Sequence, residues 1–191
     1  MYNDLIQPWN TRSMSDESAL AEAAREDPAA FASLYERYVE RVYWYMQARV
    51  GWEDAQDLTQ QVFLRALDAL ARYHPQKGPF AAWLFGIARH VAADYHRRSR
   101  RVPFQHGLPS GASVVVQDLE GGVMRTEDLA CLQTLLGALD PDKREILALR
   151  FAARLTAAEI GRLIGKSEAA TQKYLARILQ SLKEHYHADT G

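Results

Sequence analysis

The chain has few cysteines, almost no net charge and no long hydrophobic run. One cysteine, Cys131, stands among 191 residues, so disulfide frameworks and cysteine zinc sites are excluded within the chain. The uncharged runs are short and broken by glycine or proline, and none resembles a signal peptide or a membrane span. We therefore expect a cytoplasmic protein without membrane insertion. The formal net charge of −1 at pH 7 argues against a protein that coats nucleic acid along its length.

The usual signatures of catalysis are also missing. There is no His-Glu-x-x-His run and no glycine loop for phosphate, patterns that would indicate a metalloprotease or a nucleotide-binding enzyme. The candidate metal ligands, His90 with Asp94 and His185 with His187, are isolated, and such histidines more often face solvent or phosphate. We therefore expect no enzyme activity, no cofactor and no metal site.

Charge is distributed unevenly along the chain. The first forty residues are acidic overall, whereas residues 89–101 contain five arginines and one acid, Asp94. A local basic patch in a protein of almost neutral net charge predicts contact with a particular nucleic-acid element and modest affinity for random DNA.

Almost every periodic segment has the spacing of an α-helix. Asp27-Pro28 and Asp140-Pro141 are helix starts, each with a cap residue followed by proline at the first helical position. Glycine and proline break the pattern between residues 102 and 126, which is typical of a flexible linker. We predict an all-α protein of two small helical domains joined by a flexible linker, with a mobile tail at 1–15, a helical bundle at 16–101, the linker at 102–126 and a second domain at 127–187. The helices of the bundle are expected near residues 16–25, 28–51, 53–72 and 79–98. In the second domain the helical pattern resumes at about Glu127, and another helix is expected at 142–151.

The most informative segment, residues 156–183, encodes a short helix, a tight turn and a longer helix. Thr156 and Glu159 have the spacing of a capping box, Gly165 can supply the left-handed backbone that ends the short helix, and Ser167 can cap the longer one. The longer helix is apolar on one face and carries small, amide and basic side chains on the other. Such an outer face suits the DNA major groove, so we predict a DNA-binding helix-turn-helix. The alternative is an ordinary helical hairpin with a solvated face.

Two further helices carry unusual surfaces. In residues 79–98, small residues and cations lie opposite the apolar face, and Trp83 borders a loop that holds Lys77. An unstacked base needs a flat ring to stack on and a cation near its backbone, although a core tryptophan beside a solvated helix end fits the spacing equally well. The helix at 53–72 is either a central bundle helix or a partner-binding helix, because it has a second apolar face formed by Phe63, Leu67 and Leu70.

Three segments resemble bacterial sigma-70 family factors, in that family's order. Residues 54–67 are similar to the segment that binds core RNA polymerase, and residues 80–98 resemble the −10 promoter segment. Residues 139–151 with the helix-turn-helix resemble the −35-binding domain. The short two-domain layout is similar to that of the extracytoplasmic-function (ECF) group, and the resemblance covers residues 18–100 and 127–185. Three motifs in order are far more specific than one helix-turn-helix.

The resemblance implies a sigma factor, which binds core RNA polymerase and directs promoter-specific transcription initiation without a catalytic residue. Its partners would be core RNA polymerase, promoter DNA and an anti-sigma factor. It assigns core-polymerase binding to Asp54, Asp57, Leu58, Gln60, Gln61 and Phe63. It assigns −10 DNA binding to Lys77, Trp83, Arg89, His90, Arg97 and Arg98, with the loop at 73–79 holding a flipped base. It assigns −35 DNA binding to Arg162, Lys166, Ser167, Gln172, Lys173 and Arg177.

The chain departs from the family pattern at two points. His90 stands where family members often have asparagine, which changes the hydrogen-bonding groups that face the −10 region. Tyr174 stands where the recognition helix often has arginine, so the location of the −35 reader is predicted but its preferred sequence is not. The alternative function is a stand-alone helix-turn-helix regulator that binds DNA as a dimer without polymerase.

Overall fold

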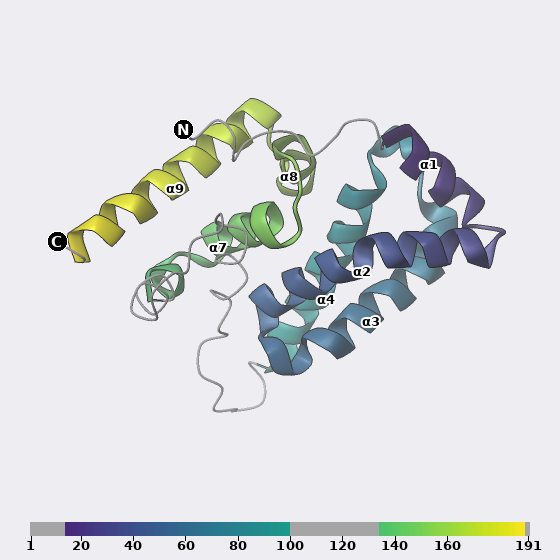
Figure 1. Ribbon diagram of the computed structural model, residues 1–191, viewed down its shortest axis with the longest axis horizontal. Helices are drawn as coiled ribbons and strands as arrows, with labels where there is room; N and C mark the ends of the chain where they lie inside the picture. Colours follow the sequence, from purple (N-terminus) through teal and green to yellow (C-terminus); the bar gives the residue numbers. More distant parts are fainter. Residues whose placement is uncertain (1–13, 100–133, 190–191) are drawn as a thin grey trace.

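The computed structural model describes residues 14–99 and 134–189, and its regular elements in these ranges are all helical, with no strand. This confirms the all-α fold class. The predicted linker and nearly all of the predicted tail lie outside the described residues. Four α-helices of the first range form a bundle, drawn from purple to teal in Figure 1: α1 (Met14–Ala23), α2 (Pro28–Val50), α3 (Trp52–Ala69) and α4 (Phe80–Ser99).

Local signals set the ends of these helices. The Asp27 side chain caps α2 by accepting a hydrogen bond from the Ala29 N–H at 2.9 Å, and Pro28 occupies the first turn, as predicted. Gly51 ends α2 with a φ of 94°, a backbone conformation that costs glycine little. The predicted helix at 53–72 ends in a 3-10 turn, η3 (Leu70–Arg72), and a second such turn, η4 (Pro75–Lys77), precedes α4.

Aromatic rings fill the centre of the bundle. The ring centroids of Tyr38 and Phe80 are 5.4 Å apart and those of Tyr45 and Phe85 are 5.6 Å apart, both edge to face. All four rings are buried, and burial of each phenylalanine contributes roughly 1.5–3 kcal/mol. Helical spacing places Phe85 between the apolar and the polar face of α4, so its burial was not predictable from periodicity alone.

The second described range holds a short helical turn at 134–138 and three α-helices. The predicted helix at 142–151 widens at its end into a π-helical turn, η5 (Ala148–Ala152). The Ala153 N–H donates to the Ala148 carbonyl five residues earlier at 2.9 Å. Buried Arg150 spans this turn and donates from Nη1 to the Leu155 carbonyl at 2.9 Å, and burial lowers the pKa of its guanidinium. The elements are α7 (Pro141–Leu147), η5 (Ala148–Ala152), α8 (Ala157–Ile164) and α9 (Glu168–Asp189).

Helices α8 and α9 form the predicted helix-turn-helix. Both halves of the capping box are present: the Thr156 N–H donates to Glu159 Oε2 at 2.8 Å, and the Glu159 N–H donates to Thr156 Oγ1 at 3.2 Å. Gly165 ends α8 in the left-handed conformation with a φ of 68°. Ser167 Oγ accepts from the Ala170 N–H at 3.3 Å, so the three caps predicted for the helix-turn-helix are confirmed.

The two helical units pack on each other. The turn η5 lies on α2, and α8 lies on α4, so the second unit, green to yellow in Figure 1, adjoins the bundle. The α4 face that carries small residues and cations takes part in this contact. Ala82 is buried, and a Cβ built at Gly86 would lie 3.6 Å from Leu163 Cδ2 of α8. Small residues on this face therefore admit a neighbouring helix of the same chain.

None of the described helices combines the length and the hydropathy that crossing a membrane requires.

Candidate nucleic-acid interface

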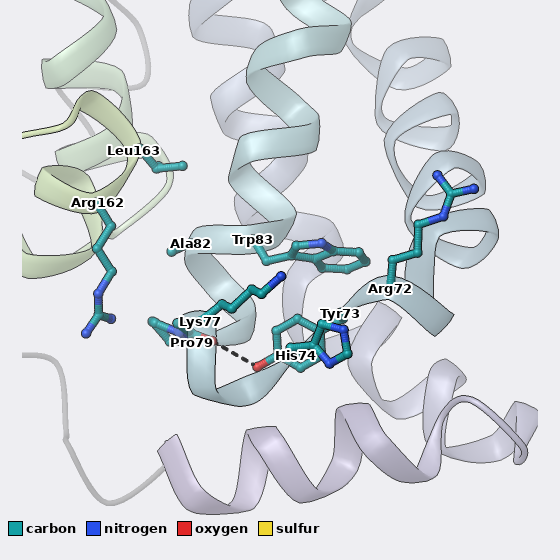
Figure 2. Close-up of a pocket in the computed structure, with 10 residues that line it drawn as sticks. Arg72, Tyr73, His74, Lys77, Pro79, Ala82, Trp83, Arg162 and Leu163 are labelled. Carbon is teal, nitrogen blue, oxygen red and sulfur yellow. Dashed lines mark hydrogen bonds between the residues drawn. The ribbon is translucent and has the colours of Figure 1, made fainter.

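A pocket of about 210 Å³ lies at the start of α4, where the loop at 73–79 meets the helix (Figure 2). It is smaller than the roughly 300–1,000 Å³ of common ligand pockets, which suits a single planar group. The Tyr73 hydroxyl donates to the Gly78 carbonyl at 3.2 Å and holds the loop closed. The lining residues are Arg72, Tyr73, His74, Lys77, Gly78, Pro79, Ala82, Trp83, Arg162 and Leu163.

Trp83 is both a packed residue and a pocket wall. Its ring centroid lies 5.3 Å from that of Tyr73 and 5.3 Å from that of Phe80, and burial raises the pKa of the Tyr73 hydroxyl. The indole is nevertheless only half-buried and lines the pocket. Trp83 is therefore packed on one side and open to the pocket on the other, and stacking of a base on this ring stays a prediction.

Cations surround the pocket from three segments of the chain. Lys77 is exposed on the predicted loop, Arg72 precedes it, and Arg162 extends from α8 on the opposite side (Figure 2). We predicted Lys77 here, but not Arg72 or His74, although Arg72 directly precedes the loop and His74 lies in it. Arg162 was assigned to a different DNA element, and only the packing of α8 on α4 brings it to this pocket.

The remaining predicted −10 residues differ in their exposure and in the partners that they already have. His90 and Arg98 are exposed, with His90 Nδ1 2.7 Å from the Gly86 carbonyl. Arg97 is exposed and paired with Asp94, whose pKa is lowered by the hydrogen bond from Arg65 and then by that from Arg97. Arg89 contacts the second helical unit, because its Nη1 donates to the Leu163 carbonyl of α8 at 2.6 Å. The surface of α4 thus carries fewer free cations than its sequence suggests.

The predicted −35 residues share an exposed surface at the helix-turn-helix. Arg162 and Lys166 precede α9, and Ser167 combines exposure with its capping bond. On α9 the residues that point away from the core are all exposed, namely Ala169, Gln172, Lys173, Ala176, Arg177 and Gln180. The opposite face is buried through Thr171, Leu175 and Ile178. This is the division of faces that a helix lying in a major groove requires.

A different surface lies on α3. Leu64 and Leu67 are 63% and 48% exposed, and Tyr35 of α2 is 40% exposed; its ring packs on Phe63 with 4.7 Å between centroids. Exposed leucines grouped in this way are unusual for a free surface and typical of a protein-binding one. We call Tyr35, Leu64 and Leu67 the α3 apolar patch.

The structure divides the predicted polymerase-binding residues between surface and core. Asp57, Gln60 and Gln61 are exposed beside the α3 apolar patch. Asp54 is half-buried and accepts a hydrogen bond from the Tyr95 hydroxyl at 2.6 Å, which together with burial raises the pKa of that hydroxyl. The side chains of Leu58 and Phe63 are buried. Leu64 was missed, although its place three residues before Leu67 signalled a shared face.

Within the described ranges, no group of three or more histidine, cysteine, aspartate or glutamate residues is placed to hold a metal ion. The site is built from stacking, cationic and amide groups.

Comparisons with known proteins agree with this arrangement. Residues 34–102 match the family Sigma-70 region 2, and residues 129–182 match Sigma-70, region 4. The ECF RNA polymerase sigma factor BldN of Streptomyces coelicolor is 36% identical over 164 residues, which cover 85% of this chain and 61% of BldN. The ECF RNA polymerase sigma factor SigD of Mycobacterium tuberculosis is 34% identical over 176 residues, 88% of this chain and 82% of SigD. The chain thus spans less than two thirds of BldN but most of SigD.

The fold has a counterpart among solved structures. CnrH, determined in complex with the cytosolic domain of CnrY, superimposes with a TM-score of 0.64 at 25% identity and covers 91% of this chain and 98% of the CnrH chain. CnrH is an RNA polymerase sigma factor of Cupriavidus metallidurans. Two sigma-70 regions in the family's order, and relatives of this kind over most of the length, establish that the chain belongs to the extracytoplasmic-function group of the sigma-70 family.

Proposed function

We propose that this protein joins core RNA polymerase and directs transcription from promoters that carry matching −35 and −10 elements. The observation that supports the proposal is that one chain carries two different surfaces, each suited to a different form of DNA. The outer face of α9 suits duplex DNA, and the pocket at Trp83 suits an unstacked base. A regulator that only bound a duplex operator would have no use for the pocket.

The −35 element is assigned to the helix-turn-helix. Gln172 and Arg177 present groups that read base edges, since glutamine pairs with adenine and arginine with guanine in the major groove. Lys173 adds a third donor, and Arg162 with Lys166 would hold phosphates at the turn. Tyr174 is half-buried, so it contributes little to readout.

The −10 element is assigned to the pocket and to α4. Trp83 offers a stacking surface worth roughly 1–3 kcal/mol per base, and Lys77 places a cation at the rim. Each base held here stabilises the melted strand, so strand opening is driven by binding free energy. The protein performs no bond-breaking chemistry in this scheme.

Core polymerase is assigned to the α3 apolar patch and the polar groups beside it. A group of exposed apolar side chains rimmed by Asp57, Gln60 and Gln61 has the composition of a protein interface. Buried Leu58 and Phe63 would support this surface from the core. We also infer an anti-sigma partner, and the structure of CnrH in complex with the cytosolic domain of CnrY supports this inference.

A gel-shift experiment on a library of genomic fragments tests the proposal. Fragments should be retained by the protein together with core polymerase, and not by either alone. Leu67→Asp places a charge within the α3 apolar patch and should weaken core binding at least about tenfold, because burying an unpaired charge is costly. Ala19→Asp adds the same charge at an exposed position of α1 and should leave core binding unchanged.

The rival function predicts a different outcome of the same experiment. A dimeric helix-turn-helix regulator would shift selected fragments tightly without core polymerase, and Leu67→Asp would have no effect on that shift. This result would replace the sigma-factor proposal.

A further inference from the structure

Helix α1 and the turn after it precede the residues that match Sigma-70 region 2, which begin at residue 34. The proposed function gives this segment no role, but the segment is packed on the bundle. Ala21 and Ala24 are buried, and α1 contacts both α2 and α4. The turn also reaches the pocket loop at 73–79, because its Arg25 donates from Nη2 to the Tyr73 carbonyl.

Tyr73 is fixed by several hydrogen bonds. Its N–H donates to the Leu70 carbonyl at 3.0 Å, and its hydroxyl donates to the Gly78 carbonyl at 3.2 Å. The bond from Arg25 satisfies its carbonyl. Tyr73 is only 2% exposed, and a buried residue whose polar groups are all satisfied is held in one position.

A second side chain of the N-terminal segment reaches the same tyrosine. Burial raises the pKa of the Tyr73 hydroxyl, and a side-chain hydrogen bond with Ser18 of α1 opposes this shift. Ser18 and Arg25 therefore contact Tyr73 at opposite ends, one at the hydroxyl and the other at the backbone carbonyl.

The ring of Tyr73 supports the ring of Trp83. The two centroids are 5.3 Å apart with the planes at 50°, and the Tyr73 centroid lies 5.5 Å from that of Phe80 with the planes at 89°. Trp83 lines the pocket above Tyr73 (Figure 2). Close-packed groups transmit a displacement to their neighbours, so a shift of the Tyr73 backbone would tilt the indole.

We propose that Arg25 is a positioning residue of the −10 pocket: by fixing the Tyr73 carbonyl, it holds the Trp83 ring in the orientation that stacks an unstacked base. This rests on the proposed function and extends the −10 site to a segment outside the matched family region. Arg25 touches no base in this scheme. A ring that is already in place loses less freedom when the base binds, so the base is held more tightly.

Binding of single-stranded oligonucleotides by the full chain with core polymerase tests this role. The probe carries the −10 sequence of a promoter mapped by run-off transcription, and a matched set of probes has each base in turn replaced by an abasic site. The stacked base is the one whose loss weakens binding by the wild type but not by Trp83→Ala. Stacking of one base is worth roughly 5- to 150-fold in affinity.

Arg25→Ala should weaken binding of the intact probe at least about threefold. It should leave binding of the probe that lacks the stacked base unchanged. Arg25→Lys keeps one donor and should restore most of the affinity. Arg37→Ala is the matched control, because Arg37 pairs with Glu17 of α1 at 3.6 Å and ties α1 to α2 rather than to the loop. Its binding of the intact probe should equal that of the wild type.

A double-mutant cycle distinguishes positioning from a general loss of stability. In a Trp83→Ala background, Arg25→Ala should have no further effect on binding of the intact probe, because the ring that it positions is gone. Urea unfolding checks that each variant is folded. Ser18→Ala, which releases the other end of Tyr73, is the second variant and should show the same selective loss.

A direct contact between Arg25 and the phosphate backbone would give a different result. Its removal would weaken the intact and the abasic probes equally, and would reduce the slope of log affinity against log salt by about 0.7. Equal weakening of both probes, additive effects in the cycle, or wild-type binding by folded Arg25→Ala overturns the proposal.

The outcome is separable from that of the proposed function. If the wild type binds the intact probe and every abasic probe equally, the assignment of the pocket and the positioning role both fail. If the wild type discriminates between the probes and Arg25→Ala does so equally well, only the positioning role fails.

Discussion

Replacing Gly161 with alanine should disrupt the turn of the helix-turn-helix. A Cβ built on Gly161 would lie 2.5 Å from the Lys166 carbonyl oxygen and 3.0 Å from Thr171 Oγ1. The nearer neighbour is backbone, and the Lys166 N–H donates to the Gly161 carbonyl at 2.8 Å. The Lys166 carbonyl oxygen cannot rotate away as a side chain would, so the backbone of the turn has to shift.

Gly86→Ala is the matched control, and comparison with it gives the expected change in the free energy of unfolding for Gly161→Ala. Both glycines are helical, and alanine is favoured over glycine in a helix interior by up to about 1 kcal/mol. At Gly86 the new Cβ meets Leu163 Cδ2 at 3.6 Å, an ordinary contact, so the free energy of unfolding should rise by up to about 1 kcal/mol. At Gly161 overpacking costs typically 1–3 kcal/mol, and a clash with backbone lies at the upper end. We expect a net loss of about 1–2 kcal/mol there.

Urea unfolding of the full chain, followed by far-UV circular dichroism, measures both effects. In thermal unfolding each kcal/mol corresponds to about 2–4 °C in a chain of this length. Gly161→Ala should also weaken −35 binding, because the turn positions α9. The reasoning is refuted if Gly161→Ala is as stable as Gly86→Ala.

Three further predictions concern the nucleic-acid surfaces and the junction between the units. Trp83→Ala should destabilise the open promoter complex by about 1–3 kcal/mol through lost stacking, and Trp83→Phe by less; complex lifetimes measure this, and equal lifetimes would exclude stacking. Arg177→Ala should cost about 1–3 kcal/mol on a promoter with its −35 element and little on one without it, as competition binding would detect. Burial, and then Glu145, raise the pKa of Tyr45, so its stabilisation is complete below the unfolded pKa of about 10 and is lost above it at about 1.4 kcal/mol per pH unit. Urea unfolding from pH 9 to 11 should show a smaller slope in Tyr45→Phe, and an unchanged slope would contradict this.

The helix ends were predictable because their causes are local. The capping box of Thr156 and Glu159 and the left-handed Gly165 depend on residues a few positions apart, and the sequence contains all of them. Asp140 illustrates the limit: the helix begins at Pro141 as predicted, but the Asp140 side chain makes no capping hydrogen bond. Instead it pairs with Lys143 at 3.0 Å.

The candidate site was predictable in location but not in exposure. Helical spacing places Ala82, Gly86 and Arg89 on one face of α4, but it cannot tell whether DNA or another helix covers that face. The contacts of Glu145 with Tyr45 and Arg89 were not predicted, because these partners lie 100 and 56 residues away in sequence. Long-range contacts of this kind depend on how two units dock, and no periodicity within one helix encodes that.

Run-off transcription with purified core RNA polymerase on genomic DNA tests the central claim most directly. We predict promoter-specific transcripts that appear only when the protein is added, and that are lost in the Leu67→Asp variant but kept in Ala19→Asp. The claim is contradicted if core polymerase gives the same transcripts with and without the protein.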